Sequence, residues 1–163
     1  MRISAKCSVA IHCLLLISEY SAKLKITSEL AAESTGCNPA AIRSILNALK
    51  KAGLISIRRG VGGAVLSRAP EEISVWDIYQ AVEPDGLERM MGVHPNPSES
   101  CPVGKRIETV LETSYAQIED AVAASMRDLR LSDFVGTFRE MKANHLSDRD
   151  IVHKTGKSIP EGS

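Results

Sequence analysis

The feature that most constrains this chain is a glycine-rich turn, Gly60-Val61-Gly62-Gly63, between two short apolar runs. The first run covers residues 54–58, and the second covers residues 64–67. Short apolar runs on either side of such a turn predict two antiparallel strands joined by a narrow hairpin. Because Arg58 and Arg59 directly precede the glycines, the exposed tip is a candidate anion-binding element. The alternative is a tight turn with ordinary surface charge.

Helix signals precede the hairpin at close spacing. Thr27 is a candidate N-cap for a short helix that ends at Gly36, since glycine is typical just after a helix C-terminus. Asn38 and Pro39 supply an N-cap and a first-turn proline for another helix, which Gly53 ends. The apolar positions of that helix recur at intervals of three and four residues, which predicts a core-facing stripe. They are Ile42, Ile45, Leu46 and Leu49.

Two further helices complete the predicted domain. Residues 4–20 carry two apolar stripes, so this helix is expected to be buried on two sides. Residues 73–82 form the other helix, with Ser74 as its candidate cap. A helix, a helix–turn–helix and then a hairpin is the order of a winged helix. The fold class we predict is therefore mainly α with a small β-wing, a winged helix-turn-helix, at residues 1–82.

The second half of the chain is predicted to form a separate segment that supports the winged helix. Residues 83–101 are rich in proline and glycine and read as a loop, and residues 102–143 read as a long helix of about 40 Å and a short terminal helix. A single apolar stripe along so long a helix favours pairing with a second copy. The residues expected at that dimer interface are Val103, Ile107, Leu111, Ile118 and Val122. Residues 144–163 are polar and predict a mobile tail.

Charge is distributed unevenly, although the net charge of the whole chain is zero. Up to Arg68 there are ten basic and three acidic residues, a net charge of +7, and the remainder carries ten and seventeen, a net charge of −7. A basic half of this kind favours a nucleic acid as partner. The chain shows no nucleophile elbow, zinc-protease motif or phosphate loop, so we expect no enzyme. No apolar run is long enough to span a membrane, and a cytoplasmic location is expected.

The helix after Asn38 is the candidate recognition helix, because such helices present base-reading side chains near their N-terminus in the major groove. Arginine pairs with guanine edges and asparagine with adenine edges, while lysines suit phosphates. The alternative is the solvated face of a core helix. The predicted DNA-binding residues are Ser28, Asn38, Pro39, Ala40, Arg43, Asn47, Lys50, Arg58, Arg59, Gly62 and Gly63.

Three segments resemble a known family, namely the start Arg2-Ile3-Ser4-Ala5-Lys6, the run from Ala48 to Ile55, and the wing motif from Arg58 to Ala64. Together they are similar to the IscR/NsrR/CymR (Rrf2) family of bacterial winged-helix regulators, and residues 96–105 resemble its YwnA-like branch. The resemblance, over about residues 1–140, implies a homodimeric DNA-binding transcription regulator, usually a repressor. It also implies base-facing roles for Asn38, Ala40 and Arg43, and a wing arginine at Arg59.

The loop departs from the iron–sulfur members of that family, which carry three cysteines there. Here it holds only Cys101, with His94 as a further ligand type, whereas a cluster generally needs about four protein ligands. We therefore expect no cofactor and no metal. Cys101 lies at a predicted helix N-terminus near two cations, which favours a reactive thiolate, and Cys37 is its candidate partner across a dimer. The alternative is that Cys101 simply packs the loop.

The sequence thus predicts a homodimeric regulator that binds a pseudo-palindromic DNA operator, with redox sensing through Cys101. The resemblance implies that it is a repressor. Two alternatives stay open. One is a winged-helix module that binds a protein, for example a metabolic enzyme, through the acidic half. The other is a sensor that contains a cluster or a metal.

Overall fold

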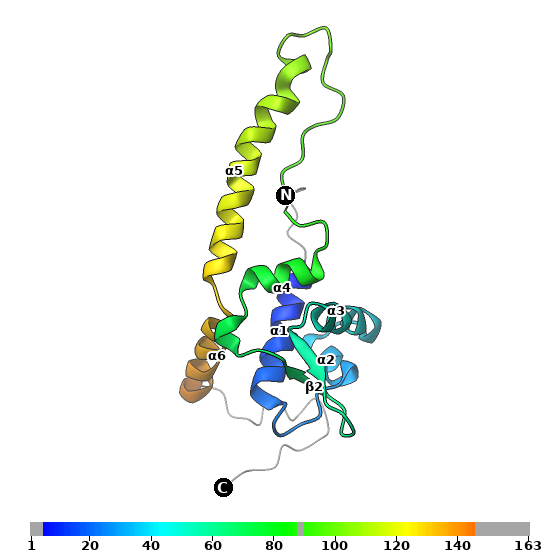
Figure 1. Ribbon diagram of the computed structural model, residues 1–163, viewed down its shortest axis with the longest axis vertical. Helices are drawn as coiled ribbons and strands as arrows, with labels where there is room; N and C mark the ends of the chain where they lie inside the picture. The colour runs from blue at the N-terminus through cyan, green and yellow to red at the C-terminus, as the bar shows by residue number, and fades with distance from the viewer. Residues whose placement is uncertain (1–4, 88–89, 146–163) are drawn as a thin grey trace.

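The computed structural model describes residues 5–87 and 90–145 and confirms a mainly helical winged-helix fold (Figure 1). The first half contains α1 (Ala5–Tyr20), α2 (Ser28–Thr35), α3 (Pro39–Lys51), β1 (Ile55–Ile57), β2 (Ala64–Leu66) and α4 (Val75–Val82). The second half contains α5 (Ile107–Asp128) and α6 (Leu131–His145). Short 3₁₀ turns precede α4 at Pro70–Glu72 and α5 at Gly104–Arg106.

Helix α1 is the centre of the core. Its buried side chains come from both predicted stripes, because α2, α3 and β2 pack against it along with α4 and α6. They are Cys7, Ala10, Cys13, Leu14, Leu16, Ile17 and Tyr20. The prediction of a helix buried on two sides is therefore confirmed. On the α6 side, Arg139 donates to Glu19 at 2.9 Å and fixes α6 beside α1.

The β-wing is a two-stranded antiparallel sheet in which Ile55 lies opposite Leu66 and Ile57 opposite Ala64. A further hydrogen bond, from the Ala64 backbone N–H to the Ile26 carbonyl at 2.9 Å, attaches the wing to the segment before α2. Ile55 and Ala64 are buried at opposite ends of the sheet, so the sheet packs on the core along its length, while residues 58–61 of the turn are exposed.

Helix α4 begins with a capping box. The Ser74 hydroxyl accepts from the Asp77 backbone N–H at 3.1 Å, and the Asp77 carboxylate accepts from the Ser74 backbone N–H at 2.9 Å. Each side chain satisfies a backbone donor that a helix start leaves unpaired. The predicted cap at Ser74 is confirmed, and Ile73 and Ile78 on either side of it are fully buried.

Helix α5 stands away from the rest of the molecule (Figure 1). It starts at Ile107, five residues after the predicted start at Pro102, because the preceding residues form tight turns. The Cys101 backbone N–H donates to the Ser98 carbonyl and the Lys105 N–H to the Cys101 carbonyl. The helix has 22 residues, about 33 Å rather than the 40 Å predicted. Ala123 is its only fully buried side chain.

The joint between α5 and α6 is clamped to the start of α4. The Val75 N–H donates to the Leu129 carbonyl at 2.9 Å, and the Leu131 N–H donates to the Ile73 carbonyl at 2.8 Å. One turn before the joint, the Arg127 guanidinium lies 4.9 Å from the centre of the Trp76 ring. α5 is therefore tied to the winged helix at its C-terminal end.

Helix α6 runs to His145, two residues beyond the predicted end of the helical segment at residue 143. The remainder of that predicted tail, residues 146–163, lies outside the described residues. Within the part of the chain that is described, no helix is both long enough and apolar enough to cross a membrane.

Candidate nucleic-acid interface

The helix–turn–helix is fixed by local caps. The Thr27 hydroxyl accepts from the Leu30 N–H at 3.2 Å, and α2 ends at Gly36 in the left-handed conformation, with φ at 68°. The Asn38 side chain then accepts from the Ala40 N–H at 2.8 Å, and Pro39 is the first residue of α3. The angle between α2 and α3 is thus set by the three-residue connection that the sequence predicted.

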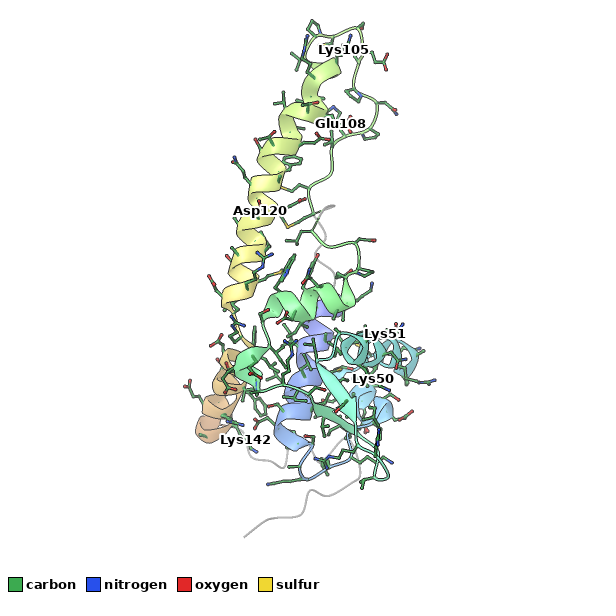
Figure 2. The ribbon with its side chains drawn as sticks, in the orientation of Figure 1. Lys50, Lys51, Lys105, Glu108, Asp120 and Lys142 are labelled. Carbon is green, nitrogen blue, oxygen red and sulfur yellow. The ribbon has the colours of Figure 1, made fainter. Side chains whose placement is uncertain are left out.

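Helix α3 has one buried face and one exposed face. Ile42, Ile45 and Leu49 are buried as predicted, and Leu46 is half-buried beside them. The predicted DNA-binding residues of α3 and of the connection before it are all exposed. They are Asn38, Pro39, Ala40, Arg43, Asn47 and Lys50. Figure 2 shows Lys50 and Lys51 on α3, far from Lys105 at the distal end of the molecule.

The N-terminus of α2 is less suited to a phosphate than predicted. The Ser28 hydroxyl donates to the Glu29 carboxylate at 3.0 Å, so it serves that side chain rather than a free anion. The pKa of Glu29 is lowered by its own backbone N–H, then by the Ser28 and Thr27 hydroxyls and by the charge of Arg43. Glu29 is therefore ionised at neutral pH, and its charge opposes a phosphate at this position.

The wing tip presents its arginines as predicted. Arg58 and Arg59 are exposed, and the Arg58 N–H closes the turn by donating to the Gly63 carbonyl at 3.1 Å. Gly60, Gly62 and Gly63 have φ of 78°, 72° and 86°, a region that residues with a Cβ rarely adopt. The tip therefore needs glycine at these positions whether or not the glycines touch a ligand.

Lys25, which was not among the predicted DNA-binding residues, lies against the wing. A Cβ added at Gly62 would lie 2.8 Å from Lys25 Cε and 2.9 Å from Lys25 Nζ. In the sequence Lys25 is only a charged residue in a polar connection, and no local pattern links it to a turn 37 positions later. The interface thus carries another cation beside Arg58 and Arg59.

Within residues 5–87 and 90–145, no cation of α3 or the wing forms an ion pair, and the pairs of Lys6 with Glu83 and of Arg139 with Glu19 lie elsewhere. Arg43 is close enough to Glu29 for its charge to lower the pKa of that carboxylate. An open groove also runs between α3 and α4, lined by Asn47, Lys51 and small residues such as Ala81. The surface of α3 and the wing is accordingly basic and open.

None of the five residues predicted for a dimer interface is fully buried within one chain. Val103, which lies before α5, is 68% exposed, and Ile118 is 40% exposed. Ile107, Leu111 and Val122 are half-buried. Val110 was not predicted but is 63% exposed on α5; it lies three residues after Ile107, a helical spacing that could have identified it.

The four cysteines differ in their surroundings. Cys7 and Cys13 are buried, as expected of core residues, and burial raises the pKa of Cys13 to about 11. Cys37 is half-buried and close enough to Cys13 for the two thiols to interact electrostatically. Cys101 is exposed, and the backbone N–H groups of Gly104 and Val103 lower its pKa.

Cys101 and Cys37 do not meet within one chain. Cys101 is hydrogen-bonded to Lys105, which Figure 2 places at the far end of α5 from α2 and α3. The predicted pairing of Cys101 with Cys37 is therefore possible only between the two chains of a dimer. Among the described residues no three His, Cys, Asp or Glu side chains gather where they could hold a metal ion.

The fold and this surface define a class: winged helix-turn-helix transcription regulators. A family model described as "Rrf2: Iron-dependent Transcriptional regulator" matches residues 3–137. The chain belongs to the Rrf2 family, which confirms the resemblance, and it is a transcriptional regulator rather than an enzyme.

Individual relatives agree with this assignment. The chain is 37% identical over 131 residues to YwnA of Bacillus subtilis (strain 168), named as an HTH-type transcriptional regulator, covering 80% of this chain and 95% of YwnA. A solved structure described as a DNA-binding protein is 32% identical with a TM-score of 0.63, covering 79% of this chain and 97% of that one. The structure of T. potens IscR, 18% identical, shares the fold with a TM-score of 0.65, covering 92% and 96% of the two chains.

Proposed function

We propose that this regulator is a homodimer that binds a pseudo-palindromic DNA operator and represses transcription. The observation that carries the proposal is the basic surface formed by the exposed face of α3 and the wing, whose cations form no ion pair among the described residues. The family model and the relative described as a DNA-binding protein support duplex DNA as the anion that this surface binds.

On this proposal α3 enters the major groove. Arg43 and Asn47 are exposed one turn apart and have the donors and acceptors that read guanine and adenine edges. Lys50, further along the same helix, binds a backbone phosphate. Arg59 on the wing enters the adjacent minor groove, where a narrow A·T-rich segment deepens the negative potential.

Fluorescence anisotropy with labelled duplex DNA tests this function. Binding is expected to weaken steeply between about 50 and 200 mM salt, since each neutralised phosphate releases counterions. Genomic footprinting of the bound sites then identifies the operator, and its half-sites are expected about one helical turn apart. Binding that is insensitive to salt, or absent, would favour a module that binds a protein.

The dimer supports the proposal because α5 has an uncovered apolar surface. Val110 and Ile118 on α5 are exposed, while only Ala123 of the whole helix is fully buried. A 22-residue helix with so little packing gains stability by pairing with a second copy. A two-fold dimer also presents two copies of α3, as a palindromic operator requires.

The family resemblance implies that the regulator represses transcription and does not activate it. A dimer seated on an operator that overlaps a promoter excludes the polymerase. A reporter driven by the footprinted promoter is expected to rise when the regulator is deleted. A fall in reporter output would show an activator instead.

A thiol-based response at Cys101 is the second part of the proposal, favoured by its exposure and lowered pKa. The Cys101 thiolate attacks one sulfur of a low-molecular-weight disulfide. It forms a mixed disulfide and releases the other half as a thiolate, so atoms and electrons balance. Cys37 of a partner chain remains the candidate second thiol, because the two cysteines of one chain lie far apart.

Mass spectrometry after exposure to cystine tests this response, combined with DNA binding before and after treatment. The parent is expected to gain one cysteinyl group at Cys101 and to change its DNA affinity. Cys101→Ser is expected to do neither. An unchanged response in Cys101→Ser assigns Cys101 to packing the loop.

The regulator is also proposed to work without an iron–sulfur cluster, in spite of the iron-dependent description of its family. The loop offers Cys101 as its one thiolate, and a cluster needs about four ligands. Protein purified without oxygen is expected to show no visible absorption band. A brown protein with such a band would establish the cluster-containing sensor.

A further inference from the structure

The Lys25 side chain lies flat against the glycine backbone of the wing. The Cβ position of Gly63 is 3.0 Å from Lys25 Cγ, and that of Gly62 is 2.8 Å from Cε and 2.9 Å from Nζ. The stem of the lysine therefore follows the turn from one glycine to the next. The two glycines leave the space that a side chain would otherwise fill, and the ammonium group ends beside Gly62.

The backbone that directly follows Lys25 is held in place. Ile26, the next residue, is buried and accepts the Ala64 backbone N–H at 2.9 Å, which joins this segment to β2. The Lys25 stem thus extends from an anchored backbone across a closed turn. A lysine ordered in this way loses less conformational entropy on binding an anion than a free surface lysine does.

The Lys25 side chain itself is exposed, and its charge meets no carboxylate among the described residues. Arg58 and Arg59, from the same turn, are exposed as well. A strongly hydrated ammonium suits a phosphate oxygen as a point charge, whereas arginine suits base edges and the narrow minor groove.

We infer that Lys25 is a phosphate-binding residue of the wing, positioned by Gly62 and Gly63 to contact the DNA backbone beside the groove that Arg59 enters. This inference rests on the proposed function and adds to it a residue on the connection between α1 and α2. It also gives Gly62 a second role besides adopting a positive φ, because a Cβ at this position displaces the ammonium group of Lys25.

A charge-removal pair provides the first test. Lys25→Met keeps an unbranched stem and removes the charge, and Lys23→Met is the matched control, since Lys23 is an exposed lysine on the same connection. The probe is a labelled 30-base-pair duplex of mixed sequence, titrated from about 50 to 200 mM KCl. One lost phosphate contact lowers the slope of log K against log salt by about 0.9, which is about an eight-fold loss at 0.1 M.

A glycine pair provides the second test. Gly60→Ala and Gly62→Ala introduce a Cβ at nearly the same φ, 78° and 72°, but only Gly62 has Lys25 in the way. The backbone strain is therefore matched, and the two variants are expected to melt at similar temperatures. Gly62→Ala is expected to weaken duplex binding several-fold more than Gly60→Ala, and this difference is expected to vanish in a Lys25→Met background.

The outcomes separate this inference from the function it rests on. A parent protein that shows no salt-dependent binding of the duplex overturns both. A parent that binds, with the same slope for Lys25→Met as for the parent, overturns only the role of Lys25. An equal loss for Gly60→Ala and Gly62→Ala overturns the positioning by Gly62. A lower slope for Lys25→Met alone, with the glycine difference described, supports the whole inference.

Discussion

Truncating the exposed apolar side chains of α5 is expected to dissociate the proposed dimer. Val110 is 63% exposed and Ile118 is 40% exposed, whereas burying a complete valine or isoleucine side chain contributes about 1.5–3 kcal/mol. Burying the exposed part of either side chain is then expected to contribute about 1 kcal/mol to dimerisation. A two-fold interface contains each residue twice. Because alanine keeps one methyl group, the double variant Val110→Ala/Ile118→Ala is expected to lose about 3 kcal/mol, or about 100-fold in the dimer dissociation constant.

Sedimentation equilibrium over a concentration series measures this constant. Met141→Ala is the matched control, since Met141 is 58% exposed but lies on α6. Circular dichroism at 222 nm adds a second readout, because an unpaired α5 with one fully buried residue is expected to lose helix on dissociation. A double variant that stays as dimeric as the control, or a parent that is monomeric at high concentration, would refute the assignment of α5.

Four other substitutions test the interface and the core. Arg59→Ala and Arg43→Ala are each expected to weaken operator binding by about 1–3 kcal/mol without changing the melting temperature, and Arg68→Ala is the exposed control. Leu131→Ala, at a fully buried position, is expected to cost about 2–5 kcal/mol of unfolding free energy in urea. The pKa of Cys13 is about 11 when folded and 9.0 when unfolded, so the unfolded state ionises first and stability falls as pH rises from 9 to 11. Cys13→Ala is expected to flatten that decline, and an equal decline in both proteins would contradict the burial argument.

Local signals in the sequence were sufficient to predict the winged-helix fold. Thr27, Gly36, Asn38 and Ser74 each act within a few residues of themselves, and each occupies the predicted cap or terminus. Capping depends on short-range hydrogen bonds, so it can be identified without knowing the rest of the fold. The buried stripe of α3 followed from periodicity for the same reason.

The features that depend on approach between distant segments were not predictable in this way. Pro102 resembles the first residue of a helix, but the turns around Ser98 and Cys101 occupy that stretch and delay α5 to Ile107. The contact of Lys25 with Gly62 depends on the wing folding back onto the connection before α2.

The position of α4 explains how the two halves of the chain are joined. Its start carries the hydrogen bonds to Leu129 and Leu131, and Trp76 carries the contact with Arg127, so the C-terminal end of α5 is attached to α4. α4 also packs directly on α3. A dimer formed through α5 therefore fixes the separation of its two recognition helices through one short helix on each side. In the proposed dimer, half-site spacing in the operator therefore depends on the α4 joint as well as on the α5 interface. The reason is that, among the described residues, α3 packs more extensively on α4 than on α5 of its own chain.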